Sequence, residues 1–212
     1  KTKNKNTNEN TKGAPTQTTN HQPTPLAQPD TKTVRSILYT TPTDTNKNNI
    51  VASSPTFYIT HQEMLCLRPK TYINDAVINT YLTQLTDRHT NITTVHTNTY
   101  NTITQNLGGT PTTWANKTAV SDLATLTHSQ NVIVPIHYRN HWSLVHVYRN
   151  THTITHYDSC KGTHNSNIVL ANISSALQQI TQTYQTYTLK SMKTRQQQNA
   201  YDCGLYLAHT AH

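Results

Sequence analysis

The chain has 212 residues, 33 % of them hydrophobic, with a formal net charge of +8 and a pI of about 9.4. This length suits one domain with a tail, whose core must come from a few apolar segments. A basic balance favours polyanionic or acidic partners, but here it comes from scarce acids, 9 Asp and Glu against 17 Lys and Arg. Without an Arg-rich helix or a basic stripe interleaved with aromatics, specific recognition of nucleic acid is not expected.

The three cysteines, Cys66, Cys160 and Cys203, are far apart and form no CxxC pair. This spacing argues against a disulfide framework and a Cys-rich zinc site, and it favours a reducing, intracellular setting, in the nucleus or the cytoplasm. No apolar run approaches the length of a membrane span, so a membrane partner is not expected. The first residue is Lys rather than Met, which suggests a fragment or a processed piece.

Residues 1–50 contain few large apolar side chains and are expected to form a disordered, polar and basic tail, because they cannot bury enough area to offset their ordering entropy. The exception is VRSILY, Val34 to Tyr39, which we interpret as an edge strand or a short docking motif. Structure is expected to begin near Phe57, with a strand at 57–60 and a helical turn that ends before Pro69.

The next helix is predicted in TYINDAVINTYLTQL, where apolar residues recur at helical spacing and Asn74 or Asp75 can cap the N-terminus. Residues 92–100 form a weak strand candidate, residues 110–117 are predicted to be a loop, and residues 120–126 one or two helical turns. Strands are predicted at 131–137, 142–148 and 153–158. The helix that follows places the apolar residues between Val169 and Tyr184 on one face. A strand in TYTLKSM and a helix from GLYLAHTAH complete the chain. This order of elements indicates an α+β domain.

The tetrapeptide RNTH, residues 149–152, predicts the hairpin turn between the last two of those three strands. If the turn centres between Asn150 and Thr151, Asp158 lies opposite Ser143. His141 then shares a face of the sheet with Asp158 as its diagonal neighbour, within reach of a His–carboxylate hydrogen bond. A slip of one residue would separate them.

A histidine oriented by an aspartate is half of a nucleophilic catalyst, and Cys203 is the candidate for the other half. A helix start and a nearby imidazolium both favour a thiolate, the competent nucleophile. Gln197 could donate its side-chain amide to an oxyanion, beside the Cys203 backbone N–H. Taken one at a time, each residue also has a structural reading: Cys203 as a small buried hydrophobe, Asp158 as a turn residue, and Gln197 as part of a Gln-rich stretch.

The ordered segments HWSLVHVY, ITHYDS and QQQNAYDCGLYL resemble the ubiquitin-like-protein proteases, the SUMO-deconjugating family related to the adenovirus maturation proteinase. The segments LRPKTYINDAVINTYL, VIVPIHYRNHWSL and LKSMKTRQQQNAYDCG extend the resemblance from about Phe57 to the end of the chain. It implies a papain-like variant fold, in which helices flank a central mixed sheet and the nucleophile lies at a helix N-terminus. Residues 51–212 would be the catalytic domain, and a chain that stops nine residues after Cys203 suggests truncation of the last helix.

The resemblance also implies roles for individual residues. His141 would be the general base, Asp158 its orienting partner, Gln197 an oxyanion donor and Cys203 the nucleophile. The substrate-binding residues would be Trp142 and Tyr72, as walls around a Gly-Gly tail, and Asp75, facing basic side chains of the modifier. Three departures from the family pattern bear on this site, namely Tyr72 in place of Trp, Arg195 in place of Pro, and Ala200 in place of Gly.

The sequence thus predicts a monomeric cysteine endopeptidase that needs no metal or organic cofactor. It would cleave after the Gly-Gly tail of a ubiquitin-like modifier, most plausibly SUMO, in deconjugation or precursor processing. Three alternatives stay open: a maturation protease that cuts a viral or mobile-element polyprotein, an acetyl-CoA-dependent acyltransferase, and a decayed module that only binds ubiquitin-like proteins.

Overall fold

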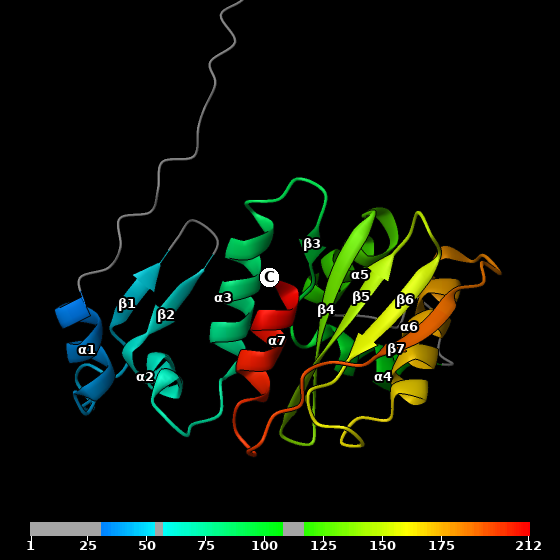
Figure 1. Ribbon diagram of the computed structural model, residues 1–212. Helices are drawn as coiled ribbons and strands as arrows, with labels where there is room; N and C mark the ends of the chain where they lie inside the picture. The colour runs from blue at the N-terminus through cyan, green and yellow to red at the C-terminus, as the bar shows by residue number, and fades with distance from the viewer. Residues whose placement is uncertain (1–30, 54–56, 108–116) are drawn as a thin grey trace, which may run out of the picture.

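The computed structural model describes residues 31–53, 57–107 and 117–212. Its centre is a mixed five-stranded sheet in the order β3-β4-β5-β6-β7 (Figure 1). Neighbouring strands among the middle three are antiparallel, whereas both outer strands run parallel to their neighbours. The strands are β3 (Thr93–Thr94), β4 (Asn131–Tyr138), β5 (His141–Tyr148), β6 (Thr153–Tyr157) and β7 (Thr188–Met192).

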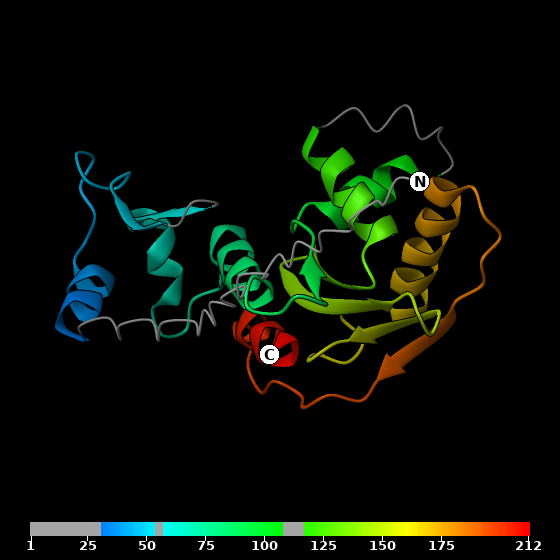
Figure 2. The ribbon, with the colours of Figure 1, turned by 90° about the horizontal axis from the view of Figure 1, so that it is seen from above.

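Helices cover both faces of this sheet, as the view from above shows (Figure 2). One face packs against α3 (Asp75–Thr86) and α7 (Cys203–Ala211), and the other against α4 (Thr99–Asn106), α5 (Lys117–His128) and α6 (Ser166–Thr181). Each interface has its own apolar core. Because the middle strands are covered on both sides, nearly all of their residues are buried, and β4 is a near-continuous apolar run. The predicted α+β class with helices around a mixed sheet is confirmed.

Side-chain caps set the starts of two helices. The Asn74 side chain accepts a hydrogen bond of 3.0 Å from the Val77 N–H, so Asn74 is the N-cap of α3. Asp75 is the first residue of that helix, where its negative charge complements the helix dipole. The Asn165 side chain likewise accepts hydrogen bonds from the first N–H groups of α6.

The segment before the sheet corrects two expectations. Val34 to Tyr39 lie in a helix, α1 (Thr31–Tyr39), and not in a strand. Residues 31–50 are therefore not a featureless tail, because α1 docks on the elements that follow: His61 Nε2 donates to the carbonyl of Ile37 over 2.8 Å, and Arg68 Nε donates to the carbonyl of Leu38. These elements are β1 (Ile50–Ser53), β2 (Tyr58–Thr60), α2 (His61–Met64) and the short 3-10 helix η1 (Leu65–Leu67). Residues 1–30 lie outside the described residues.

Other expectations were only partly correct. The candidate strand at 92–100 is reduced to β3, because α4 already begins at Thr99. Tyr184, placed on the face of a helix by its spacing, lies beyond the end of α6 and is 98 % exposed. In the expected loop at 110–117, α5 begins at Lys117, and residues 110–116 lie outside the described part of the chain.

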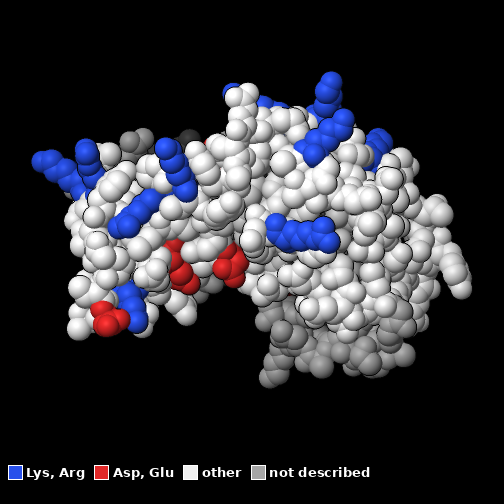
Figure 3. Space-filling view, turned by 90° about the horizontal axis from the view of Figure 1, so that it is seen from below, with Lys and Arg blue, Asp and Glu red and all other residues white. Residues whose placement is uncertain are grey.

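The surface agrees with the modest role expected for charge. Seen from below, Lys and Arg side chains are scattered among uncharged residues and form no continuous basic stripe on that face (Figure 3). Within the described ranges, none of the helices combines the length and the apolar character that crossing a bilayer requires.

Candidate active site

Three segments that are far apart in the sequence meet at one edge of the sheet. The turn between β4 and β5, the loop after β6 and the start of α7 all lie at the lower edge in Figure 1. They carry His141, Asp158 and Cys203, respectively. The register of the strands therefore positions His141 and Asp158, and the packing of α7 on the sheet positions Cys203.

The β5–β6 register brings His141 and Asp158 together. Tyr148 pairs with Thr153 and Leu144 with Tyr157, so the turn centres where the sequence predicted. One further step along this ladder sets Ser143 opposite Asp158. His141 Nε2 then lies 2.6 Å from Asp158 Oδ1, with 6 % and 9 % of the two side chains exposed. The diagonal contact predicted from the hairpin is confirmed.

Opposing effects set the protonation of this pair. Burial lowers the pKa of His141, but its hydrogen bonds with Asp158 and with the Cys203 thiol outweigh burial and raise the pKa from 6.5 to about 9. Burial raises the pKa of Asp158, yet the bond from His141 and the backbone N–H of Cys160 bring it below its usual value. An imidazolium and a carboxylate are therefore the favoured forms at neutral pH.

Backbone and side-chain donors hold the loop that carries Asp158. The N–H of Cys160 donates to Asp158 Oδ1 over 2.9 Å, and the N–H of His164 donates to Oδ2 over 3.3 Å. The carbonyl of Asp158 accepts from Thr194 Oγ1 at 2.8 Å and from Gln196 Nε2 at 3.0 Å. The carboxylate and the carbonyl of Asp158 are thus each held by two donors that come later in the chain.

Cys203 is the first residue of α7, whereas the sequence predicted a helix that begins one residue later, at Gly204. This places it among the unpaired N–H groups and the positive end of the helix dipole. Its side chain is fully buried in the core shared with Trp142 and Ile73. Gly204 allows this packing, because a Cβ there would come within 2.8 Å of Ile73 Cβ. This glycine therefore faces the Ile73 side chain.

Gln197, the expected oxyanion donor, is tied to residues on both sides of the site. Its Nε2 donates to the carbonyl of Asn199 over 2.6 Å, and its Oε1 accepts from Ser159 Oγ over 2.8 Å. Its backbone N–H donates to the carbonyl of Ser159. The side chain thereby joins the loop after Asp158 to the segment that leads into Cys203.

The three expected substrate-binding residues differ in exposure. Trp142 is only 2 % exposed, its Nε1–H donates to the carbonyl of Ile73 over 2.8 Å, and its ring stacks on His137 with centroids 4.2 Å apart. Tyr72 is 52 % exposed, and Asp75 is also exposed. Trp142 therefore supports the backbone beside Tyr72 from within the core, while the other two face solvent.

His164, a buried histidine that the sequence did not single out, lies beside the His141–Asp158 pair. His164 packs edge-on against His141, with ring centroids 4.8 Å apart. With thirteen histidines in the chain, this one carried no distinguishing signal; only its position six residues after Asp158, in the same loop, could have pointed to it.

The same cluster is the candidate metal set among the described residues. Ligand atoms of His141, Asp158 and His164 lie within 4.8 Å of one another. However, His141 Nε2 is bonded to Asp158, and both ring nitrogens of His164 are hydrogen-bonded to Ser143 and Tyr138. The geometry is that of a hydrogen-bonded network, and a metal ion would have to displace these bonds.

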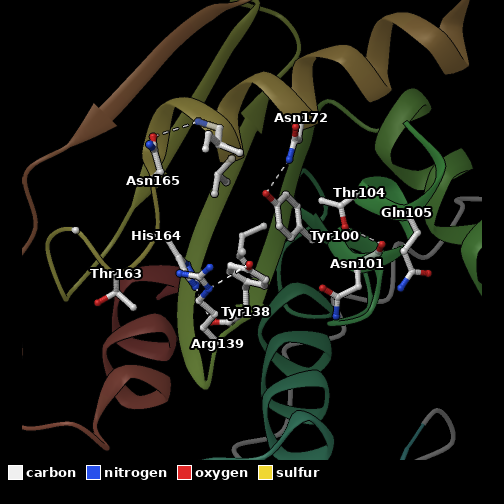
Figure 4. Close-up of a pocket in the computed structure, with 14 residues that line it drawn as sticks. Tyr100, Asn101, Thr104, Gln105, Tyr138, Arg139, Thr163, His164, Asn165 and Asn172 are labelled. Atoms are coloured by element: carbon white, nitrogen blue, oxygen red, sulfur yellow. Dashed lines mark hydrogen bonds between the residues drawn. The ribbon is translucent and has the colours of Figure 1, made fainter. Parts of the chain in front are cut away.

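A hollow of about 550 Å³ lies beside the end of the β4–β5 hairpin (Figure 4). Tyr138, Arg139 and His164 line it on the hairpin side, and Tyr100 and Asn172 line it on the helical side, joined by a hydrogen bond of 3.1 Å. His164 therefore separates this hollow from the His141–Asp158 pair.

Comparisons with known proteins bear on the family and the fold. The family model described as "Ulp1 protease family, C-terminal catalytic domain" matches residues 71–212, more than half of the chain. No curated protein gives a significant sequence match.

Solved structures show the same fold. The yeast Ulp1 C-terminal protease domain, in complex with the SUMO ortholog Smt3, has a TM-score of 0.68 at 17 % identity, covering 86 % of this chain and 82 % of that chain. The Ulp1-like SUMO protease catalytic domain of Chaetomium thermophilum has a TM-score of 0.61 at 17 % identity, covering 89 % of this chain and 78 % of that chain. The resemblance inferred from the sequence is thus confirmed, and the chain belongs to the Ulp1 protease family of cysteine proteases.

Proposed function

We propose that the protein cleaves after the C-terminal Gly-Gly of a SUMO-like modifier, with Cys203 as nucleophile, His141 as general base and Asp158 as its orienting partner. The observation that carries this proposal is the 2.6 Å bond between His141 and Asp158 at the site where the thiol of Cys203 also reaches the imidazole. The Smt3 complex of the yeast Ulp1 domain supports this class of modifier.

The reaction would proceed through a thioester. The Cys203 thiolate attacks the carbonyl carbon of the last glycine, and the imidazolium of His141 then gives its proton to the departing amine. The amine leaves, and the acyl group stays on sulfur. His141 next takes a proton from water, which attacks the thioester and releases the modifier with a free carboxylate. Asp158 keeps the ring oriented and stabilises its positive charge throughout.

The oxyanion of each tetrahedral intermediate would be stabilised by the backbone N–H of Cys203 and by the Gln197 amide. An amide nitrogen carries two N–H bonds, so the contact of Gln197 with Asn199 leaves one for this purpose. The bond from Ser159 to Gln197 Oε1 sets the rotamer of the amide, as preorganised stabilisation requires.

The substrate tail would pass between Tyr72 and Trp142, with Asp75 meeting basic side chains of the modifier. Trp142 is held by its bond to Ile73 and is nearly buried, whereas half of the Tyr72 surface is exposed, so the entering tail would have to uncover the Trp142 ring. Glycine suits such a passage because it lacks a Cβ. Since Cys203 has no exposed surface, a neighbouring side chain has to move as the tail enters.

Covalent capture tests this proposal. The chain is incubated with SUMO, ubiquitin and NEDD8 that carry a C-terminal thiol-reactive group, and adducts are identified by mass. We expect a SUMO adduct that is lost in Cys203→Ala and retained in Cys160→Ala and Cys66→Ala, which remove the other two free thiols. A folded protein that forms no adduct with any modifier would refute deconjugation. Cleavage of polypeptides at internal Gly-X sites would then favour the maturation protease.

A further inference from the structure

His164 connects the two segments that carry the charged pair. It lies in the loop between β6 and α6 and is 4 % exposed. Its backbone N–H reaches Asp158, its Nε2 lies 2.9 Å from the carbonyl of Tyr138, and its Nδ1 lies 2.7 Å from Ser143 Oγ. Tyr138 ends β4 and Ser143 lies two residues after His141 in β5, so one ring contacts both strands of the hairpin. Figure 4 shows His164 beside Tyr138.

The hydrogen bonds determine which nitrogen carries the proton. A carbonyl only accepts, so His164 Nε2 must be protonated to bond Tyr138. In a neutral ring Nδ1 then accepts, and the hydroxyl of Ser143 donates to it. Ser143 Oγ also lies 2.9 Å from His156 Nε2, which therefore donates, leaving His156 Nδ1 to accept from Ser166 Oγ at 2.8 Å.

At the protein surface, this series of hydrogen bonds ends in a contact that agrees with the donors and acceptors assigned above. Ser191 Oγ donates to Ser166 Oγ over 3.1 Å, so the hydroxyl proton of Ser166 remains for His156. Every link from exposed Ser191 to the carbonyl of Tyr138 thus has one donor and one acceptor. Two buried histidines are held as neutral Nε2–H tautomers.

Burial favours the neutral forms of both rings, and the charges around them act in both directions. Burial is the main effect, lowering the pKa of His164 and lowering that of His156 to about 4. For His164, the Tyr138 carbonyl and Asp158 favour protonation, whereas the neighbouring His141 opposes it. The remaining charged or titratable groups at this loop are His137 on β4, Arg139 at the hairpin turn, and Lys161 and Lys193 beside Asp158.

A neutral His164 ring stabilises the ion pair of His141 and Asp158, whereas a cationic ring would weaken it. A cationic His164 would repel the imidazolium of His141 and compete with it for Asp158. It would also need Ser143 to accept, which reverses the hydrogen bond to His156. The chain of bonds through Ser143 and His156 therefore selects the state of His164 that leaves Asp158 to His141.

We propose that His164 is a positioning residue for the reaction described above: held as its neutral Nε2–H tautomer by Ser143 and His156, it clamps the Asp158 loop to the hairpin of His141 and sets the orientation of that pair. The catalytic part of this inference rests on the proposed function. The tautomers and the clamp do not, and they can be measured without a modifier.

The first test is the ring nitrogen spectrum of the wild-type protein. ¹⁵N shifts of His164 and His156, assigned by single substitutions, should show a protonated Nε2 and an unprotonated Nδ1 in both rings at pH 7. An Nδ1–H tautomer or a cationic ring at His164 would overturn the proposal. This measurement needs no variant to be active.

The second test compares pH profiles. His164→Phe keeps a ring of similar size without its hydrogen bonds, and Ser143→Ala removes a single hydroxyl should the first variant fail to fold. Alkylation of Cys203 by iodoacetamide is followed by mass spectrometry from pH 5 to 10. The ¹⁵N titration of His141 is measured over the same range, and it is sufficient by itself if the thiol is inaccessible to the reagent. We expect the midpoint of the His141 ring titration, and any basic limb of the alkylation profile that follows it, to move downward by about one pH unit.

His146→Phe is the matched control, because His146 lies on β5 with His141 and stacks on Tyr148, away from the His141–Asp158 pair. It should leave the profile unchanged. A folded His164→Phe protein with a wild-type profile and only a lower melting temperature would show a merely structural role and refute the proposal. If modifiers fail to react while the tautomers and profile shifts are as expected, the proposed substrate is wrong and the clamp stands.

Discussion

The imidazole of His141 and the carboxylate of Asp158 are joined by a 2.6 Å hydrogen bond across a separation of seventeen residues. The β5–β6 register sets this contact, and a shift of one residue would turn one side chain to the opposite face of the sheet. The consequences of this contact and of its surroundings can be tested individually.

Asp158→Asn should reduce turnover by at least about 100-fold with little loss of folded protein. The substitution preserves shape but removes the negative charge that raises the pKa of His141, and it replaces one acceptor oxygen with a donor group. Steady-state cleavage of a modifier substrate measures the effect. Asp87→Asn, an exposed acid at the end of α3, should leave the rate unchanged. Wild-type turnover in Asp158→Asn would remove the carboxylate from the mechanism.

The raised pKa of His141 predicts both an activity limit and a stability change at alkaline pH. Because the folded value is about 9 and the ordinary value 6.5, the contribution of this group to stability is complete below pH 6.5 and is lost as pH rises through 9. The rate should fall over the same upper range as the imidazolium loses its proton. Chemical unfolding and initial rates measured from pH 6 to 10 test this, and His141→Gln should flatten the stability change. An unchanged slope in that variant would assign the loss to other groups.

His146 and His156 provide a matched pair of histidines, His156 fully buried and His146 half-buried with its Nε2 atom shielded. Burial lowers the pKa of each to about 4, but His146 Nε2 has no hydrogen-bond partner, whereas both nitrogens of His156 are bonded. His146→Phe should therefore raise the free energy of unfolding by about 1 kcal/mol at pH 7, and His156→Phe should lower it by about 1–3 kcal/mol.

The same pair predicts acid sensitivity. A histidine whose folded pKa is depressed contributes its full stability above pH 6.5 and loses it as pH falls toward 4, because the unfolded chain binds the proton first. The gain from His146→Phe should thus grow between pH 6.5 and 4.5 in denaturant titrations. A gain independent of pH would mean that His146 is not buried in its neutral form.

Gly204→Ala should destabilise the protein by about 1–3 kcal/mol and slow catalysis, because its Cβ would overlap Ile73 and displace the start of α7. Denaturant unfolding and modifier cleavage measure the two effects. Leu205→Ala, at the exposed neighbouring position, should change neither substantially. If Gly204→Ala retains full stability and activity, the contact with Ile73 does not constrain the nucleophile.

Local patterns in the sequence were sufficient for most of the scaffold. The apolar segment from Asn131 to Ser159 predicted three strands, and the turn at RNTH predicted the register of the last two, because strand patterning and turn chemistry act on neighbouring residues. Val34 to Tyr39 were misread, since a short apolar run does not distinguish helix from strand. Their partners, His61 and Arg68, come 24 and 30 residues later than the carbonyls they bind.

The sequence by itself determined which residue types enter the site and in what order, through the hairpin geometry and through its family resemblance. Only the tertiary structure decided how their polar atoms are paired: the Gln197 amide with Asn199, the Trp142 indole with Ile73, and His164 with Ser143 and Tyr138. The physical reason is that a buried donor or acceptor must find a partner wherever the fold places one. Those partners come from distant strands and loops, and no local periodicity encodes them.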